Sequence, residues 1–196
     1  MTFNGVEITK EMVNYFTDRT LEHTTRVSKY LNRAILMLDL FPENKIYINF
    51  LKTEASQHDA SKYKYPEYLP YILLTWKYKK HNIDKDTSFD YDSLTKTLIN
   101  QAYEHHILNN KHHPEHWASF ITIKDNNGNK DQVLDCSRMP KEYLYVMAAD
   151  LCAMSEENGN NPIDWFKENN GKRWSLNMEQ SETIIETLYI MWRKDV

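Results

Sequence analysis

The sequence contains an adjacent histidine–aspartate pair, His58-Asp59, which can offer an imidazole nitrogen and a carboxylate oxygen to one metal ion. We expect the pair on a helix, where its side chains would diverge by about 100° and a metal above the face between them could contact both. His23 lies upstream in a segment of helical periodicity, and Asp150 lies downstream in an otherwise apolar run. Burying an aspartate is costly unless it is paired or bound to a cation. These residues predict a metal site assembled from three distant segments.

Five of the chain's eight histidines lie between residues 105 and 116. They are His105, His106, His112, His113 and His116. One ion cannot bind all five, so some are expected to orient metal ligands or to contact a substrate. The cluster predicts that this segment contributes to the same site.

Lys62 follows Asp59 by three residues, so on a helix its side chain would project over the same region. It could form a simple salt bridge with Asp59. It could equally hold a substrate phosphate beside the metal. The sequence leaves both interpretations open.

Composition points to a folded, mainly helical protein. The chain has 196 residues, enough for one domain with a real core, and 41% of them are hydrophobic. Only 4 glycines and 6 prolines are present, which favours helices over a many-stranded β fold. The formal net charge of −4 gives no electrostatic case for nucleic acid as an obligate partner.

Two further features suggest a compartment. The two cysteines, Cys136 and Cys152, lack metal-type spacing and indicate a reducing environment without disulfides. The N-terminal residues do not resemble a signal peptide, and no apolar run approaches the roughly 20 residues that span a bilayer. We expect a soluble, cytoplasmic protein with no membrane partner. A homo-oligomer is left open.

The apolar periodicity predicts an all-α fold, a single-domain helical bundle over residues 1–196 with one small β-hairpin or loop at residues 121–137. Asn127-Gly128 would form the turn of such a hairpin. Pro66 would stand in the first turn of its helix. The expected helices cover residues 7–18, about 20–41, 43–62, 66–79 and 92–109, a segment that begins at Pro140, a short segment after Asn161, and residues 178–194. Residues 80–91 are expected to form a loop, with His81 at the surface.

A longer pattern links these residues. It consists of His23, then His58-Asp59-Ala60-Ser61-Lys62 with Glu67, then His106 through Asn110 to His112-His113-Pro114-Glu115, then Asp150 with Ala153. This pattern resembles the HD-domain superfamily of metal-dependent phosphohydrolases, and within it an uncharacterised group of short proteins. The resemblance covers about residues 20–157 and implies an HD-type helical bundle, with the C-terminal helices 161–196 packing on it.

The resemblance implies that His23, His58, Asp59 and Asp150 are the metal ligands. Mixed imidazole and carboxylate ligation suits divalent Mn, Fe, Co, Ni or Zn. The implied activity is hydrolysis of a small phosphoester, in particular a nucleotide, by metal-activated water. The expected catalytic residues are Lys62, His106, His113 and Glu67, and the expected substrate-binding residues are His105, His112, Asn110 and Tyr63.

One departure leaves alternatives open. Many nucleotidases of the superfamily have a glutamate where this chain has Lys62, and a lysine there is similar to its cyclic-dinucleotide phosphodiesterases and di-iron oxygenases. The chain lacks the Gly-Tyr-Pro signature of those phosphodiesterases. A di-iron oxygenase and a non-catalytic nucleotide-binding module are therefore the alternatives. In the di-metal members of the superfamily, the two additional histidines usually lie much farther apart in sequence. Here the pairs at 105–106 and 112–113 are only seven residues apart, so we expect one tight metal, with a second left open.

Overall fold

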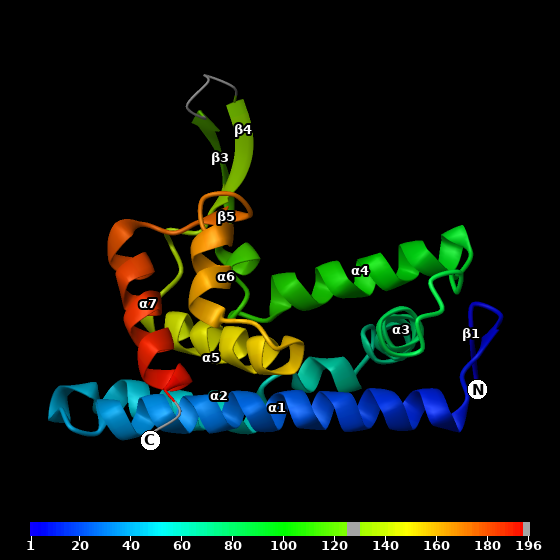
Figure 1. The fold of residues 1–196 in the computed structure, drawn as a ribbon, viewed down its shortest axis with the longest axis horizontal. Helices are drawn as coiled ribbons and strands as arrows, with labels where there is room; N and C mark the ends of the chain where they lie inside the picture. Colours follow the sequence, from blue (N-terminus) through cyan, green and yellow to red (C-terminus); the bar gives the residue numbers. More distant parts are fainter. Residues whose placement is uncertain (125–129, 194–196) are drawn as a thin grey trace. The chain divides into compact units, whose positions relative to one another are not determined.

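The computed structural model describes residues 1–124 and 130–193, and it is predominantly α-helical (Figure 1). The predicted all-α class is confirmed. Strands in the described residues form only two small sheets. The predicted Asn127-Gly128 turn lies outside the described residues.

Seven α-helices occur in the described residues: α1 Lys10–Leu38, α2 Lys45–Gln57, α3 Tyr68–Tyr78, α4 Ser93–Asn109, α5 Lys141–Asn158, α6 Pro162–Asn169 and α7 Met178–Trp192. Short 3-10 turns cover Pro42–Asn44, Ala60–Tyr63 and Pro114–Trp117, and a π-helical turn covers Lys79–Ile83. The strands are β1 Thr2–Phe3, β2 Val6–Glu7, β3 Ser119–Lys124, β4 Lys130–Asp135 and β5 Trp174–Ser175.

The chain forms two compact units, each made of two separate segments. The first unit contains residues 1–22 and 59–110, and the second contains residues 23–58 and 111–196. Each unit has a hydrophobic core of its own. The prediction of a single domain stays a prediction.

In the first unit, helix α3 packs against α4 and the N-terminal part of α1. The core side chains come from all three helices and the residues around them: Ile8, Met12, Phe16, Tyr71, Ile72, Leu73, Trp76, Tyr91 and Ile99. Strands β1 and β2 pair antiparallel, with Thr2 opposite Glu7. This packing fixes α3 and α4 relative to each other. Glu67 directly precedes α3, and His105 and His106 lie on α4.

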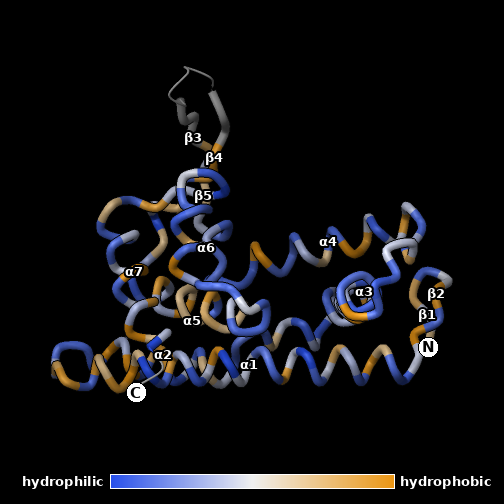
Figure 2. The backbone as a smooth tube through the Cα atoms, in the orientation of Figure 1, coloured by the Kyte–Doolittle hydropathy of each residue, from blue (hydrophilic) through white to orange (hydrophobic). Residues whose placement is uncertain are grey.

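In the second unit, helix α5 contacts α2, α6 and α7. Many of its residues are buried, as expected of a central helix, and Figure 2 shows hydrophobic residues along it. Its buried residues are Leu144, Tyr145, Val146, Met147, Ala148, Ala149, Cys152, Ala153 and Ser155. The other cysteine of the chain, Cys136, is also fully buried in this unit. Asp150 therefore lies in a helix whose residues before and after it are packed in the core.

The predicted hairpin at 121–137 is confirmed, although it begins earlier, at Ser119. Strands β3 and β4 pair antiparallel, with Ser119 opposite Asp135, and project away from α5 and α7 in Figure 1. Strand β5 was not predicted; it pairs parallel to β4, with Leu134 opposite Trp174.

Three helix starts that the sequence predicted are confirmed by their caps. Asp92 accepts a hydrogen bond from the Thr95 backbone, and Asn161 accepts one from the Ile163 backbone, both at 2.9 Å. Asn177 and Gln180 form a reciprocal capping box at the start of α7. Such polar caps satisfy backbone N–H groups that have no partner within the helix.

The predicted break between residues 18 and 20 is wrong, because α1 is one helix of 29 residues. No proline or glycine interrupts this segment. Met12, Phe16, Thr20 and His23 are buried at helical spacing, and Val27 and Leu31 continue the same face. The polar residues near position 18 face away from it, so they do not end the helix.

The prediction that a helix runs through His58 to Lys62 is also wrong. Helix α2 ends at Gln57, His58 has ψ 130°, and Asp59 has the left-handed values φ 57° and ψ 16°. Aspartate tolerates this conformation better than most residues. The two side chains are therefore separated by a sharp turn of the backbone and not by a helical step.

Two smaller predictions also change. Pro66 lies two residues before α3 and follows a cis peptide bond, so it does not occupy the first turn of that helix. The expected loop at 80–91 begins inside the π-helical turn Lys79–Ile83. His81 is partly buried there, and its Nε2 lies 2.6 Å from the carbonyl oxygen of Phe89.

Candidate metal centre

Three metal-type residues converge in the second unit. His23 comes from α1, His58 directly follows α2, and Asp150 comes from α5. The Nε2 atoms of His23 and His58 lie 3.1 and 3.8 Å from Asp150 Oδ1. One ligand atom from each of the three residues lies within 4.8 Å of the others, so this group could hold a metal ion.

The distances suit a shared ion. Nitrogen and oxygen atoms that both bind one transition metal at about 2.1 Å are roughly 3–4 Å apart. The His23 and His58 residues are only 7% and 5% exposed, whereas the Asp150 side chain retains 21% exposure. The two histidines are therefore buried, and the Asp150 side chain is partly buried.

The charge of Asp150 also suits a cation. Burial raises the pKa of this carboxyl, but hydrogen bonds with His23 and His58 outweigh burial and hold the pKa well below its ordinary range. An ionised carboxylate beside two imidazoles is the mixed donor set that divalent transition metals accept.

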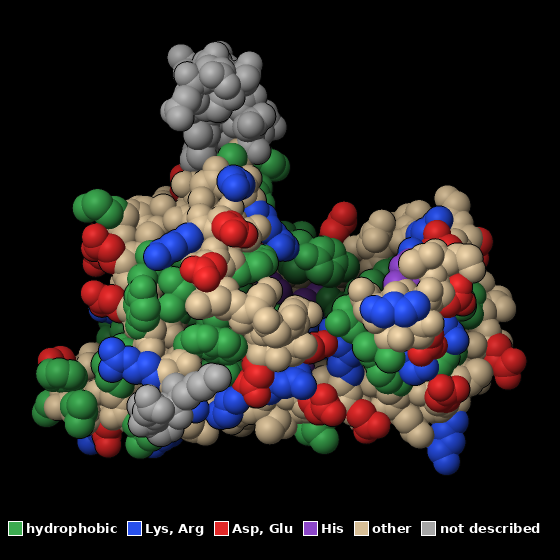
Figure 3. Space-filling model, viewed as in Figure 1, with side chains coloured by type: hydrophobic (Ala, Val, Ile, Leu, Met, Phe, Trp, Pro, Cys, Tyr) green, Lys and Arg blue, Asp and Glu red, His purple; other side chains and the backbone are tan. Residues whose placement is uncertain are grey.

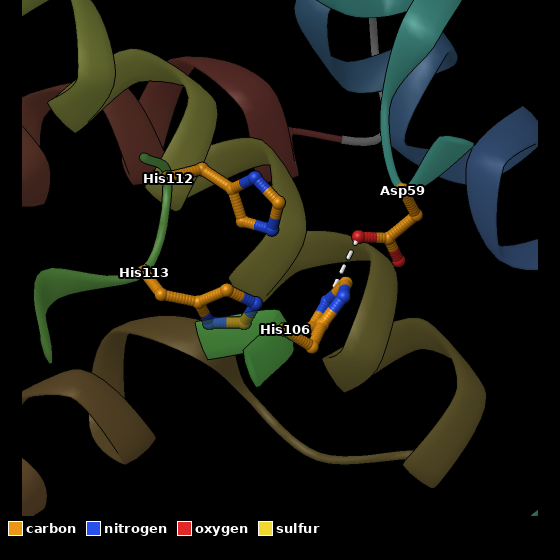
Figure 4. A group of neighbouring side chains, drawn as sticks. All are labelled: Asp59, His106, His112 and His113. Atoms are coloured by element: carbon orange, nitrogen blue, oxygen red, sulfur yellow. Dashed lines mark ion pairs between the residues drawn. The ribbon is translucent and has the colours of Figure 1, made fainter. Parts of the chain in front are cut away.

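The histidine rings continue beyond this group in the second unit. The centroid of the His112 ring lies 4.3 Å from that of His58, and the His113 ring lies 4.3 Å from His112. Figure 4 shows His112 and His113 side by side on the chain segment that follows α4. Of these two predicted site residues, His112 thus contacts a predicted metal ligand directly.

Asp59, the fourth predicted ligand, belongs to the first unit, and its partners there are polar. Its Oδ2 lies 2.5 Å from Lys62 Nζ, and its Oδ1 lies 3.2 Å from His106 Nε2, the pair marked in Figure 4. The Asp59–Lys62 salt bridge, one of the two interpretations that the sequence left open, is present. Lys62 has donors for additional partners, since an ammonium group carries three N–H bonds.

Glu67 is fully buried and accepts hydrogen bonds at both carboxylate oxygens. Oε1 lies 2.8 Å from His105 Nδ1, and Oε2 lies 2.8 Å from His106 Nδ1. Ser61 Oγ donates a further hydrogen bond to Oε2 at 2.8 Å. The site thus contains a carboxylate–imidazole–carboxylate series that runs from Glu67 through His106 to Asp59.

These contacts shift the pKa values of Glu67 and His106 so that the charged form of each is favoured. Burial raises the pKa of Glu67, but the hydrogen bonds from His106, Ser61 and His105 outweigh it and lower the pKa below the ordinary value. Burial lowers the pKa of His106, but Asp59 and Glu67 outweigh it and raise the pKa above the ordinary value. A positive His106 between two negative carboxylates is the favoured arrangement.

The remaining predicted residues lie at the edge of this network. Asn110 Nδ2 donates to Ser61 Oγ at 3.0 Å and to the His106 carbonyl at 2.8 Å. Tyr63 is 45% exposed, and its ring packs edge-on against Phe16. Tyr63 is therefore partly exposed, whereas Asn110 supports the position of His106.

Ser61 and Tyr71 belong to this network although neither was predicted as a site residue. Ser61 donates to Glu67, and its place inside the His58–Lys62 motif was a signal that could have been used. The Tyr71 ring lies 5.3 Å from both the His106 ring and Lys62 Nζ. Tyr71 stands four residues after Glu67, on the same helix face, and that spacing was its signal. His116, from the predicted cluster, packs instead against Trp117.

Comparison with known proteins places the chain in a family. A family of unknown function (DUF5662) matches residues 12–190, and the chain belongs to it. The match includes every residue of the metal-type groups described above. Searches of curated proteins and of solved structures found no match. Within the described part of the chain, every helix is too short or too polar to cross a lipid bilayer.

Proposed function

We propose that this protein is a metal-dependent phosphohydrolase that acts on a small phosphoester of the nucleotide class. The observation that carries the proposal is the convergence of His23, His58 and Asp150 from three distant segments within 4.8 Å. The resemblance of the His–(His-Asp)–Asp order to the HD-domain superfamily supplies the reaction class. Membership of a family of unknown function is compatible with this activity and does not assign it.

His23, His58 and Asp150 would hold the metal, and Asp59, the next residue after His58, is the fourth ligand that we propose. The donor set suits one divalent ion of Mn, Fe, Co, Ni or Zn. When bound, such an ion lowers the pKa of a coordinated water and polarises a phosphoryl oxygen.

The chain's own residues would bind and stabilise the phosphoryl group. Lys62 donates one N–H bond to Asp59 and can donate another to a phosphate oxygen. Asp59 and Glu67 raise the pKa of His106 above its ordinary value and so favour the doubly protonated ring, which could neutralise charge or protonate a leaving oxygen. His105, His112, His113 and Tyr63 are the proposed contacts to the rest of the substrate.

The surface agrees with a small-molecule substrate. On the face that Figure 3 shows, lysine and arginine side chains are interspersed with aspartate and glutamate, and no broad basic area is present. The net charge of −4 points the same way. Nucleic acid is therefore not the partner that we propose, and a cytoplasmic location stays a prediction.

Metal analysis followed by a phosphatase screen tests the proposal. Wild-type protein should carry one divalent metal per chain, and His58→Ala and Asp150→Asn should lose it. Asp39→Asn, at an exposed aspartate, is the matched control and should retain it. Full retention of metal in both site variants would contradict the metal assignment, and absence of phosphate release from every nucleotide with every metal would contradict the activity.

Lys62→Met tests the substrate contact separately. Phosphate release should fall by about 100-fold, the usual effect of removing a group that stabilises phosphoryl or oxyanion charge, while metal content stays unchanged. Lys64→Met changes an exposed lysine two residues away and should have little effect. Parallel loss of metal and activity in Lys62→Met would instead assign Lys62 a structural role beside Asp59.

A di-iron oxygenase is the second candidate, and the geometry of His106 favours it. Its Nδ1 faces a buried carboxylate while its Nε2 faces Asp59, as in histidines that bind a metal and are oriented by a carboxylate. Two metals per chain, falling to one in His106→Gln, together with oxygen consumption, would support this candidate against the hydrolase.

A further inference from the structure

The two histidines at the end of α4 share one buried acceptor. His105 and His106 are consecutive and their side chains leave the helix about 100° apart, yet both Nδ1 atoms lie 2.8 Å from the Glu67 carboxylate, one on each oxygen. Glu67 lies outside α4, one residue before α3. The position of one glutamate therefore sets the orientation of two rings.

The hydrogen-bond donors around Glu67 determine where the His106 proton lies. An ionised carboxylate can only accept, so a Nδ1 without a proton would set two lone pairs against each other at 2.8 Å. Asn110 Nδ2 is also 3.0 Å from His106 Nδ1, but its two N–H bonds are used by the His106 carbonyl and Ser61 Oγ. Ser61 Oγ is also 3.2 Å from His106 Nδ1, but it donates to Glu67 Oε2 at the shorter distance of 2.8 Å. With these donors used elsewhere, donors and acceptors match when His106 carries a proton on Nδ1.

We infer that Glu67 is a positioning residue that keeps the Nδ1 proton on His106 and presents His106 Nε2 as the reactive ring nitrogen. Glu67 then acts through His106 and does not itself contact a substrate, because its side chain is enclosed by Ser61 and the two histidines. His106 Nε2, 3.2 Å from Asp59 Oδ1, is then the ring nitrogen left to act on a substrate or to bind a cation.

This assignment of the proton does not depend on the reaction. The role of Nε2 in turnover rests on the proposed phosphohydrolase function, whereas the location of the Nδ1 proton can be measured in inactive protein. The two can therefore fail separately.

The direct test is NMR of protein labelled with 15N in its histidine rings, using long-range correlations that show which ring nitrogen carries the proton. The His106 signals are identified by their absence in His106→Gln. We expect Nδ1 of His106 to carry a proton at neutral pH, where Glu67 is ionised. A neutral His106 ring with its proton on Nε2, the form that free histidine favours, would overturn the inference.

Variants then test Glu67 itself. In Glu67→Gln the amide offers one oxygen in place of two, so the Nδ1 signal of His105 or His106 must change. Glu104→Gln, an exposed glutamate on α4, is the matched control and should leave both signals unchanged. Unchanged signals of both histidines in folded Glu67→Gln would overturn the inference. If Glu67→Gln does not fold, His105→Gln decides the matter, because His106 should keep its Nδ1 proton and still donate it to Glu67 Oε2.

If the wild-type protein hydrolyses a phosphoester, Glu67→Gln should also lower kcat by about 10- to 100-fold, the usual cost of removing an orienting partner. KM and metal content should change little. An NMR result as expected in a protein without phosphatase activity would leave the positioning role intact and reject the proposed function.

Discussion

Asp59 combines a left-handed backbone, at φ 57°, with a carboxylate that pairs with Lys62 and His106. Left-handed backbone costs most L-residues about 1–2 kcal/mol, and less for asparagine and aspartate. Asp59 thus both forms the turn of the backbone and pairs with the side chains of Lys62 and His106.

Two substitutions separate these roles, since Asp59→Asn and Asp59→Ala both remove the charge but only alanine resists the left-handed conformation. We expect Asp59→Ala to be less stable than Asp59→Asn by about 1 kcal/mol in urea unfolding. Equal midpoints would show that the backbone conformation contributes nothing to the difference.

Glu67 should make the free energy of unfolding depend on pH in the acidic range. Its pKa in the folded protein lies below the ordinary 4.5, so its stabilising contribution is present above about pH 4.5 and is lost as the pH falls through the lower folded-state pKa. At pH 7, Glu67→Gln should be destabilised by about 3 kcal/mol, as expected for breaking a buried charged network.

The gap between wild type and Glu67→Gln should close as the pH is lowered towards the folded-state pKa, which urea unfolding at a series of pH values can follow. Glu104→Gln should show no such change. A gap that is constant with pH would assign the effect to packing and not to charge.

At the scale of elements, helix α7 depends on its first turn. Asn177 accepts a hydrogen bond from the Gln180 backbone at 2.9 Å, and the Gln180 side chain accepts one from the Asn177 backbone at 2.9 Å. Asn177→Ala should cost about 1 kcal/mol in urea unfolding, whereas Asn177→Ser, another good cap, should cost much less. Similar losses in both variants would mean that the capping box is not the source of stability.

The sequence predicted the helices better than it predicted their ends. Apolar periodicity identified α4, α5 and α7, and the polar residues Asp92 and Asn161 marked the starts of α4 and α6. The cap at Asn177 was not predicted. The end of α2 was missed because no glycine or proline marks it, and a left-handed aspartate is encoded only by contacts that form later. The continuity of α1 was missed because polar residues near position 18 lie on its exposed side.

The candidate site divides in the same way. Histidine and aspartate types in a fixed order were enough to predict that His23, His58 and Asp150 belong together, and the structure brings these three close. The contacts of Glu67 with His105 and His106 were not predictable, because they require the packing of α3 on α4. That packing depends on core residues far from the motif.

At the scale of the whole molecule, the metal group should contribute to stability. His23, His58 and Asp150 lie on α1, at the end of α2 and on α5, so an ion that binds all three would link separate elements of the second unit. An ion present at 100 times its dissociation constant stabilises the folded state by about 2.7 kcal/mol. A chelator should therefore lower Tm, and added metal should restore it.

His58→Ala should be insensitive to the chelator, while a variant of His81, which is outside the metal group, should respond as wild type does. A wild-type Tm that is unchanged by chelation would argue against a stably bound ion.

The two cysteines of the chain, Cys136 and Cys152, are both fully buried and both belong to the second unit. Burial raises the pKa of Cys136 to about 12 and raises that of Cys152 further, so neither thiolate forms in the folded state near neutral pH. A thiol reagent in solution can react only after this unit opens. The rate at which such a reagent modifies the two native cysteines therefore reports how often this unit opens, and no cysteine needs to be introduced.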